Sequence, residues 1–273
     1  MSRDVVFGSY YPSTSLVHKL NPCVKLVLFI VFMVLIFLAK NFYAFIAIGG
    51  FLIFTIIMSR VPITSVLKSL RTVLFLIIFT AILNLFFSTG GDSKLLLKIG
   101  KIKIRKNNVL FASFMALRLI TLVMASTLLT LTTTPIELAD GVEVLLTPLA
   151  LIKFPVHTLA LIMSIALRFI PTLGEKTEQI LNAQKARGSE IDSGNFIKKI
   201  MSLVPILIPL IIASIDIANQ LADAMDARCY NGSKKRTRYK KMVVAFKDII
   251  SFVLIISLVV GVIIINKNLG GYL

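Results

Sequence analysis

Long apolar blocks constrain the fold of this chain more than any other feature of its sequence. Five of them run over about residues 24–39, 42–58, 72–87, 109–131 and 242–265. The hydrocarbon core of a bilayer is ~30 Å thick, and a helix of about 20 apolar residues crosses it. Because 57% of the residues are hydrophobic and only 16% are charged, we expect an all-α integral membrane protein with about five transmembrane helices.

The region between the fourth and the last block has a different pattern. Two long stretches, 154–190 and 195–232, begin apolar and end polar. A helix of this kind can lie at the membrane surface and continue into the cytoplasm. The alternative is that residues 155–170 and 202–217 cross the bilayer fully; Pro residues in both stretches disfavour clean spans without forbidding them.

These patterns divide the chain into three parts. Residues 1–131 form an N-terminal membrane part with four spans, and residues 242–273 form a C-terminal transmembrane helix. Residues 132–241 between them form a region of long amphipathic helices on the cytoplasmic side.

Basic residues predict the orientation of the chain in the membrane. The cluster KKRTRYKK, residues 234–241, stands directly before the last block. Clusters of this kind stay cytoplasmic, which places the C-terminus outside. Counting back over four spans places the N-terminus inside, together with the 60–71 loop, so the protein is expected in the cell membrane as a multi-pass chain.

One segment disagrees with this orientation and has its own pattern. Residues 94–106 carry six basic residues, Lys94, Lys98, Lys101, Lys103, Arg105 and Lys106, yet the count of spans places them outside. Apolar and basic residues partly alternate there around Gly100. This period of two indicates a small β-hairpin near residues 95–105.

The signatures of catalysis, metal binding and nucleic-acid binding are absent from the sequence. Gly100-Lys101 is followed by Ile102, so no phosphate-binding P-loop is present. The two histidines, His18 and His157, are far apart, and Cys23 and Cys229 lack metal-ligand spacing. The net charge of +17 is explained by basic loops. We expect no catalytic residue, metal, cofactor or nucleic-acid partner.

A short motif that occurs twice in the sequence places an arginine in apolar surroundings. MALRLI (115–120) and IALRFI (165–170) share Ala-Leu-Arg-x-Ile. An arginine inside a span, such as Arg118, is costly unless it is paired, and suggests a functional role. The interpretation that we favour is structural: Arg118 and Arg168 bind carbonyls or carboxylates, such as that of Asp216, and hold helices together.

A second repeated signature ends both long stretches. Ala183, Ala186, Arg187 and Gly188 form the first copy, and Ala224, Ala227, Arg228 and Cys229 form the second. Alanines three apart share one helix face and allow close approach of another backbone. Each copy taken singly is an ordinary helix end with a favourable cation. Taken together, they suggest a docking surface for a soluble partner with two like subunits, whose carboxylates the arginines would bind.

These residues carry a resemblance to a known family. The chain resembles the transmembrane T component of energy-coupling factor (ECF) transporters over nearly its whole length, including GSYYPSTSLVHKLNPCVKL, IALRFIPTLGEKTEQILNAQKARG and ADAMDARCYNG. The resemblance implies that the two Ala-Arg-Gly-type motifs end coupling helices, which sit in grooves on two ABC-type ATPase subunits. The motifs are Ala186, Arg187, Gly188 and Ala227, Arg228, Cys229, where Cys229 replaces the expected Gly.

The resemblance also implies a non-catalytic function and a further partner. The T component would transmit ATP-driven movement of the ATPases to a small membrane-embedded S component that binds a vitamin or a metal ion. The alternatives are a self-sufficient secondary transporter or channel, which would need its own substrate site, and a membrane-embedded enzyme.

Overall fold

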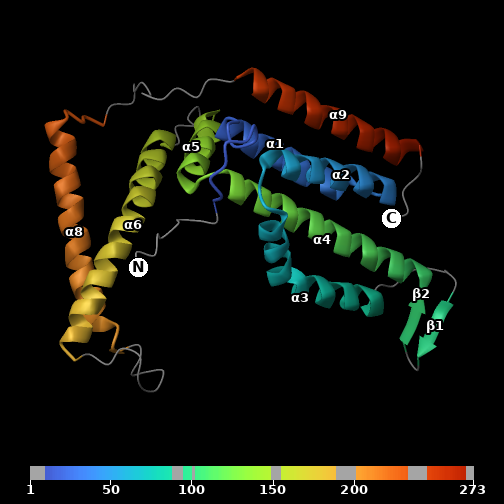
Figure 1. Cartoon of the computed structure of the whole chain (residues 1–273), viewed down its shortest axis with the longest axis horizontal. Helices are drawn as coiled ribbons and strands as arrows, with labels where there is room; N and C mark the ends of the chain where they lie inside the picture. The colour runs from blue at the N-terminus through green and yellow to red at the C-terminus, as the bar shows by residue number, and fades with distance from the viewer. Residues whose placement is uncertain are drawn as a thin grey trace. The chain divides into compact units, whose positions relative to one another are not determined.

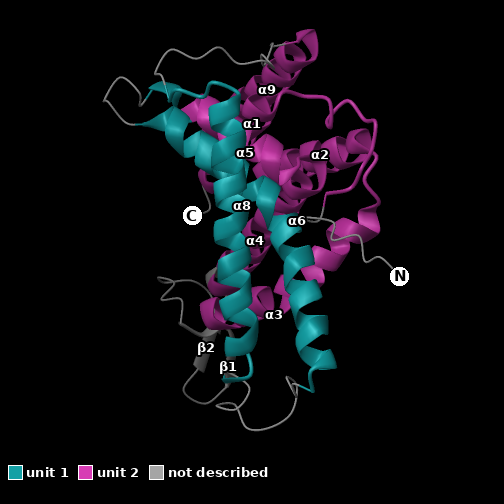
Figure 2. Ribbon diagram, turned by 90° about the vertical axis from the view of Figure 1, so that its left-hand side faces the viewer, with its two compact units in different colours: residues 1–7, 146–241 teal, residues 8–145, 242–273 magenta. Residues whose placement is uncertain are grey.

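The computed structural model describes residues 10–87, 95–99, 102–148, 155–188, 201–232 and 245–268. The chain forms two compact units (Figure 2). We call residues 8–145 and 242–273 the bundle unit, and residues 1–7 and 146–241 the helix-pair unit.

The bundle unit holds most of the helices. Its elements are α1 (Pro22–Leu38), α2 (Phe42–Ser59), α3 (Ile63–Phe87), β1 (Leu95–Ile99), β2 (Ile102–Arg105), α4 (Lys106–Thr132), α5 (Pro135–Leu146) and α9 (Phe246–Asn268). Its core lies between α1, α2, α4 and α9, where Ile36, Ala44 and Ile48 are fully buried. The rings of Phe45 and Phe114 meet in this core at 5.9 Å between centroids. Helices α1 and α2 each pack against α4 and α9.

Helix α9 runs parallel to α1 and is joined to it at both ends (Figure 1). At the N-terminal ends, buried Asp248 accepts the backbone N–H of Asn21 at 3.0 Å and that of Ala245 at 2.8 Å. At the C-terminal ends, Asn266 Nδ2 donates to the Leu38 carbonyl at 2.9 Å. Both helices therefore cross the bundle in the same direction.

Helix α5 forms a corner against the beginning of α1. Thr134 and Glu137 form a reciprocal capping box, in which each side chain accepts the other's backbone N–H. Gly141 allows the close approach: a Cβ at this position would lie 3.1 Å from the Pro22 carbonyl carbon and 3.2 Å from the Cys23 nitrogen. The boundary between the two units follows Leu145, so α5 belongs almost wholly to the bundle unit, whereas the sequence-based division places residues 132–145 with the amphipathic helices.

The expected β-hairpin is confirmed. Strands β1 and β2 pair antiparallel, with Ile99 opposite Ile102 and Lys98 opposite Lys103. Gly100, the expected turn residue, lies outside the described residues, as does the basic cluster 234–241.

The helix-pair unit contains α6 (Val156–Ala186) and α8 (Val204–Ala227). Figures 1 and 2 show the two helices side by side and running in opposite directions. Both continue through an internal proline, Pro171 in α6 and Pro209 in α8. Little of either helix is buried by the chain itself: 6% of its most apolar window in each case, against 33% in α2.

Six described helices are long and apolar enough to cross a membrane: α2, α3, α4, α6, α8 and α9. This set differs from the five expected spans in two ways. It includes α6 and α8, whose apolar halves are long enough to qualify, and it omits α1, which is apolar but has only 17 residues. The chain is a multi-pass membrane protein on either count.

Candidate functional site

The two Ala-Arg motifs adopt the same backbone conformation at the ends of α6 and α8. Arg187 is the C-cap of α6 with φ −84° and ψ 7°, and Arg228 is the C-cap of α8 with φ −94° and ψ 17°. The next residue is left-handed in both cases, Gly188 with φ 81° and Cys229 with φ 57°. The sequence repeat is therefore also a repeat in structure.

The left-handed residue explains why a small third residue belongs to the motif. When the residue after a helix is left-handed, the following backbone N–H groups can donate to the last carbonyls of the helix. Glycine adopts this conformation without steric cost. At the end of α8, Cys229 N–H donates to the Asp226 carbonyl at 2.9 Å and Tyr230 N–H donates to the Met225 carbonyl at 3.0 Å. This is a Schellman turn, and Cys229 forms it despite its Cβ.

Both motifs are accessible on the surface of the helix-pair unit. All six residues of the two triplets are exposed, and so are Ala183 and Ala224 one turn earlier. Each arginine therefore stands beside a strip of alanines that leaves room for another backbone. Among the described residues, no ion pair occupies either guanidinium, so both are available to a carboxylate.

The antiparallel pairing places the two motifs at opposite ends of the helix-pair unit (Figure 1). Helix α8 has 24 residues, which span about 36 Å at ~1.5 Å per residue. One small ligand cannot contact both arginines over such a length. A partner with two separate binding grooves can.

Arg118 has a different environment, inside the bundle unit. Its Nη2 donates to the Ala39 carbonyl at 3.3 Å, and its guanidinium carbon lies 5.7 Å from the centroid of the Phe37 ring. Arg118 thus joins α4 to the end of α1 through a backbone carbonyl and a cation–π contact. The sequence interpretation expects a contact of this kind, and the role of Arg118 stays a prediction.

Arg168 and Asp216 lie on α6 and α8, and both side chains are exposed. Among the residues that the structure describes, no ion pair joins them. They belong to the helix-pair unit and Arg118 to the bundle unit, so the three candidates do not form one cluster within a unit.

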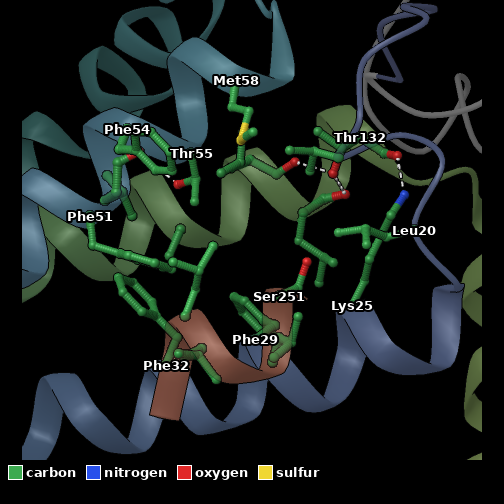
Figure 3. Close-up of a pocket in the computed structure, with 18 residues that line it drawn as sticks. Leu20, Lys25, Phe29, Phe32, Phe51, Phe54, Thr55, Met58, Thr132 and Ser251 are labelled. Atoms are coloured by element: carbon green, nitrogen blue, oxygen red, sulfur yellow. Dashed lines mark hydrogen bonds between the residues drawn. The ribbon is translucent and has the colours of Figure 1, made fainter. Parts of the chain in front are cut away.

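An apolar pocket in the bundle unit is one candidate for a substrate site of the chain's own. It is lined by α1, α2, α4, α9 and the segment before α1, with a volume of about 160 Å³ (Figure 3). Its polar side chains already bind the backbone: Thr55 to Leu52 O at 2.8 Å, Thr132 to Leu128 O at 2.8 Å, Ser251 to Lys247 O at 3.0 Å and Lys25 to Thr132 O at 2.9 Å. The pocket is smaller than typical ligand sites of ~300–1,000 Å³, and each of its polar side chains already donates to a backbone carbonyl.

The segment before α1 is organised by contacts that the sequence analysis did not identify. Lys25, which is almost fully buried, donates to the carbonyls of His18 and Thr132. His18 lies between the Ser15 hydroxyl, 2.6 Å from its Nδ1, and the Tyr11 carbonyl, 2.9 Å from its Nε2. Because a carbonyl only accepts, Nε2 carries the proton and Nδ1 accepts from Ser15. Burial lowers the pKa of His18, since it disfavours the imidazolium.

Comparison with known proteins agrees with these features. Residues 13–239 match the model of the CbiQ family, described as cobalt transport protein. The energy-coupling factor transporter transmembrane protein EcfT of Clostridium kluyveri is 44% identical over 92% of this chain and 93% of its own length. The proteins of the same name from Bacillus subtilis and Staphylococcus aureus are 41% and 39% identical, over 94% and 95% of this chain and 98% and 96% of their own lengths.

The family match includes α6, α8 and both Ala-Arg motifs, and the relatives extend over nearly the whole chain. The apolar helices, the paired helix ends and these similarities agree. The chain therefore belongs to the CbiQ family and, within it, to the transmembrane components of energy-coupling factor transporters.

Proposed function

We propose that this chain is the non-catalytic coupling subunit of an ATP-driven importer of vitamins or metal ions. It links two ABC-type ATPase subunits to a small membrane-embedded S component that binds the substrate. The observation that carries the proposal is the repeated geometry of two exposed C-cap arginines, Arg187 and Arg228, at opposite ends of one antiparallel helix pair.

The two ATPase-docking motifs are Ala186, Arg187, Gly188 and Ala227, Arg228, Cys229, in which the third residue ends the helix and so positions the arginine. Each arginine presents a planar fork of donors that fits a carboxylate in a groove of one ATPase subunit. The alanines before it allow the groove wall to approach the helix. Losing a buried charged partner of this kind typically costs ~2–5 kcal/mol of binding free energy.

The distribution of polarity in the pair supports a position at the cytoplasmic surface. Because α6 and α8 are antiparallel, the apolar start of each helix lies toward the charged end of the other. If both crossed the bilayer side by side, exposed charges such as Lys176 and Asp223 would enter the hydrocarbon, at ~2.5–3.5 kcal/mol each near its centre. At the surface, the charged ends reach water and the ATPases.

Helix α8 presents an apolar surface to which the S component can bind. Leu207, Ile208, Ile211, Ile212 and Ile215 recur at helical spacing, and each is more than half exposed. We infer that this face is the platform against which the S component moves. The N-terminus and the coupling region are cytoplasmic and the C-terminus is external, in keeping with the parallel crossing of α1 and α9.

The alternative of a self-sufficient secondary transporter receives no support from the apolar pocket of Figure 3. A transporter of that kind needs polar groups aimed at its solute. The polar side chains of this pocket all bind the backbone of the bundle unit.

The test is an Arg187→Glu, Arg228→Glu double variant, assembled with its ATPases and S component in liposomes. We expect loss of ATPase recovery in affinity purification, or ATP hydrolysis without uptake. A Lys176→Glu, Lys247→Glu double variant makes the same change of charge at exposed lysines away from the motifs and should assemble and transport normally. Normal assembly and uptake by the arginine variant would disprove the proposal.

A further inference from the structure

An open cavity of about 440 Å³ lies beside the C-terminal ends of α1 and α9 in the bundle unit. Its lining is partly apolar and partly basic: Leu35, Leu38, Val262 and Ile263, with Lys40, Asn266 and Lys267. Leu35 and Val262 are 1% exposed and form its floor, whereas Ile263 is 53% exposed. The cavity is therefore open, with an apolar floor and cationic residues in its lining.

Among the described residues, these two lysines do not supply the hydrogen bonds that satisfy the carbonyls of Leu35 and Leu38 at the helix ends. The Leu35 carbonyl accepts the Ala39 N–H at 3.1 Å, and the Leu38 carbonyl accepts Asn266 Nδ2 at 2.9 Å. Asn266 Oδ1 accepts the Lys40 backbone N–H at 3.3 Å, so both the oxygen and the nitrogen of this amide have a partner. Within the described parts of the bundle unit, neither ammonium has a hydrogen-bond or ion-pair partner.

The described acidic residues of the bundle unit lie away from this end. They are Glu137, Asp140, Glu143 and Asp248, which lie on α5 or in the first turn of α9. Both are at the opposite end of the unit from Lys40 and Lys267 (Figure 1). An anion near the two lysines would therefore meet no described carboxylate of this unit.

We propose that this cavity binds the phosphate of an anionic membrane phospholipid, held by Lys40 and Lys267. The apolar surface below, formed by Leu38 and Ile263, contacts the beginning of the acyl chains. Long lysine side chains near the ends of membrane helices reach the interface, where the lipid phosphates lie. The bound lipid would bridge α1 and α9 at the end where Asn266 already joins them. This inference does not depend on the proposed coupling function.

The experiment is native mass spectrometry of the purified chain, titrated with phosphatidylglycerol, phosphatidylcholine or inorganic phosphate. Each basic residue near an anionic lipid contributes about five-fold in affinity. A Lys40→Gln, Lys267→Gln variant should therefore bind phosphatidylglycerol about thirty-fold more weakly than the unmodified chain. A Lys19→Gln, Lys247→Gln variant loses the same charge at the opposite end of the bundle unit and should bind like the unmodified chain.

The outcomes separate the possible sources of the phosphate. Selective binding of phosphatidylglycerol, lost only in the Lys40→Gln, Lys267→Gln variant, supports the proposal. Equal binding by both variants would show unspecific association with the protein surface and overturn it. Binding of inorganic phosphate as tight as that of phosphatidylglycerol, or equal binding of phosphatidylcholine, would also overturn it. Circular dichroism of each variant confirms that the helices are intact.

Discussion

Gly141 allows the most quantitative test of how the bundle unit is held together. A Cβ built at this position lies 2.9 Å from Leu26 Cδ1, 3.1 Å from the Pro22 carbonyl carbon and 3.2 Å from the Cys23 nitrogen. The Leu26 side chain can turn away, but the other two contacts are backbone atoms in the first turn of α1. Replacing Gly141 with alanine must therefore push α5 away from α1.

Two effects of opposite sign decide the result of Gly141→Ala. Alanine in place of glycine stabilises a helix interior by about 1 kcal/mol, and overpacking of a close contact costs about 1–3 kcal/mol. We expect a net loss of up to about 2 kcal/mol in the free energy of unfolding. Gly50→Ala in α2 is the matched control, because nothing lies within 4 Å of its added Cβ. Its free energy of unfolding should rise by the helix-propensity gain of about 1 kcal/mol alone.

The assay is an SDS titration of the purified chain in mixed micelles, followed by circular dichroism. The difference between the two variants isolates the steric term and should be about 1–3 kcal/mol. If the Gly141→Ala variant is as stable relative to the unmodified chain as the Gly50→Ala variant, α5 does not contact α1 tightly in the folded protein, and the prediction is wrong.

Two further predictions concern residues outside the bundle core. Cys229→Gly should stabilise the chain by about 1 kcal/mol, because a side chain in the left-handed region costs ~1–2 kcal/mol, and Gly188→Ala should destabilise it by a similar amount. The same SDS titration measures both, and a loss of stability in Cys229→Gly would contradict the argument. The pKa of His18 is lowered in the folded chain, so the unfolded chain binds the proton more tightly and stability should fall as the pH drops below ~6.5. His18→Gln should weaken this pH dependence between pH 7 and 5, and an unchanged slope would show that His18 is not its source.

Local patterns made several features predictable from the sequence. The alternation of residues 95–105 corresponds to β1 and β2, and the two Ala-Arg signatures mark the ends of α6 and α8. These features depend on residues that are near one another in the chain, where period and capping chemistry are directly visible.

The contacts that assemble the bundle unit were not predictable in the same way. Asp248 binds the N–H of Asn21, and Asn266 binds the carbonyl of Leu38, both across more than 220 residues. A single aspartate or asparagine near a helix end has the same local appearance whether it caps its own helix or another. The position of α5 depends likewise on a glycine whose importance arises only from the backbone of α1 beside it.

The difference between Gly188 and Cys229 bears on what the third position of the Ala-Arg motif does. Gly188 and Cys229 both have positive φ and follow a C-cap arginine with nearly the same backbone angles. If the third position served mainly to contact a partner, a thiol in place of a hydrogen would alter the docking surface. If it serves to end the helix, any residue that adopts the left-handed conformation keeps the arginine in place, at a cost in stability. The shared geometry favours the second explanation, and Cys229→Gly separates the two: it should raise stability and leave the proposed ATPase binding unchanged.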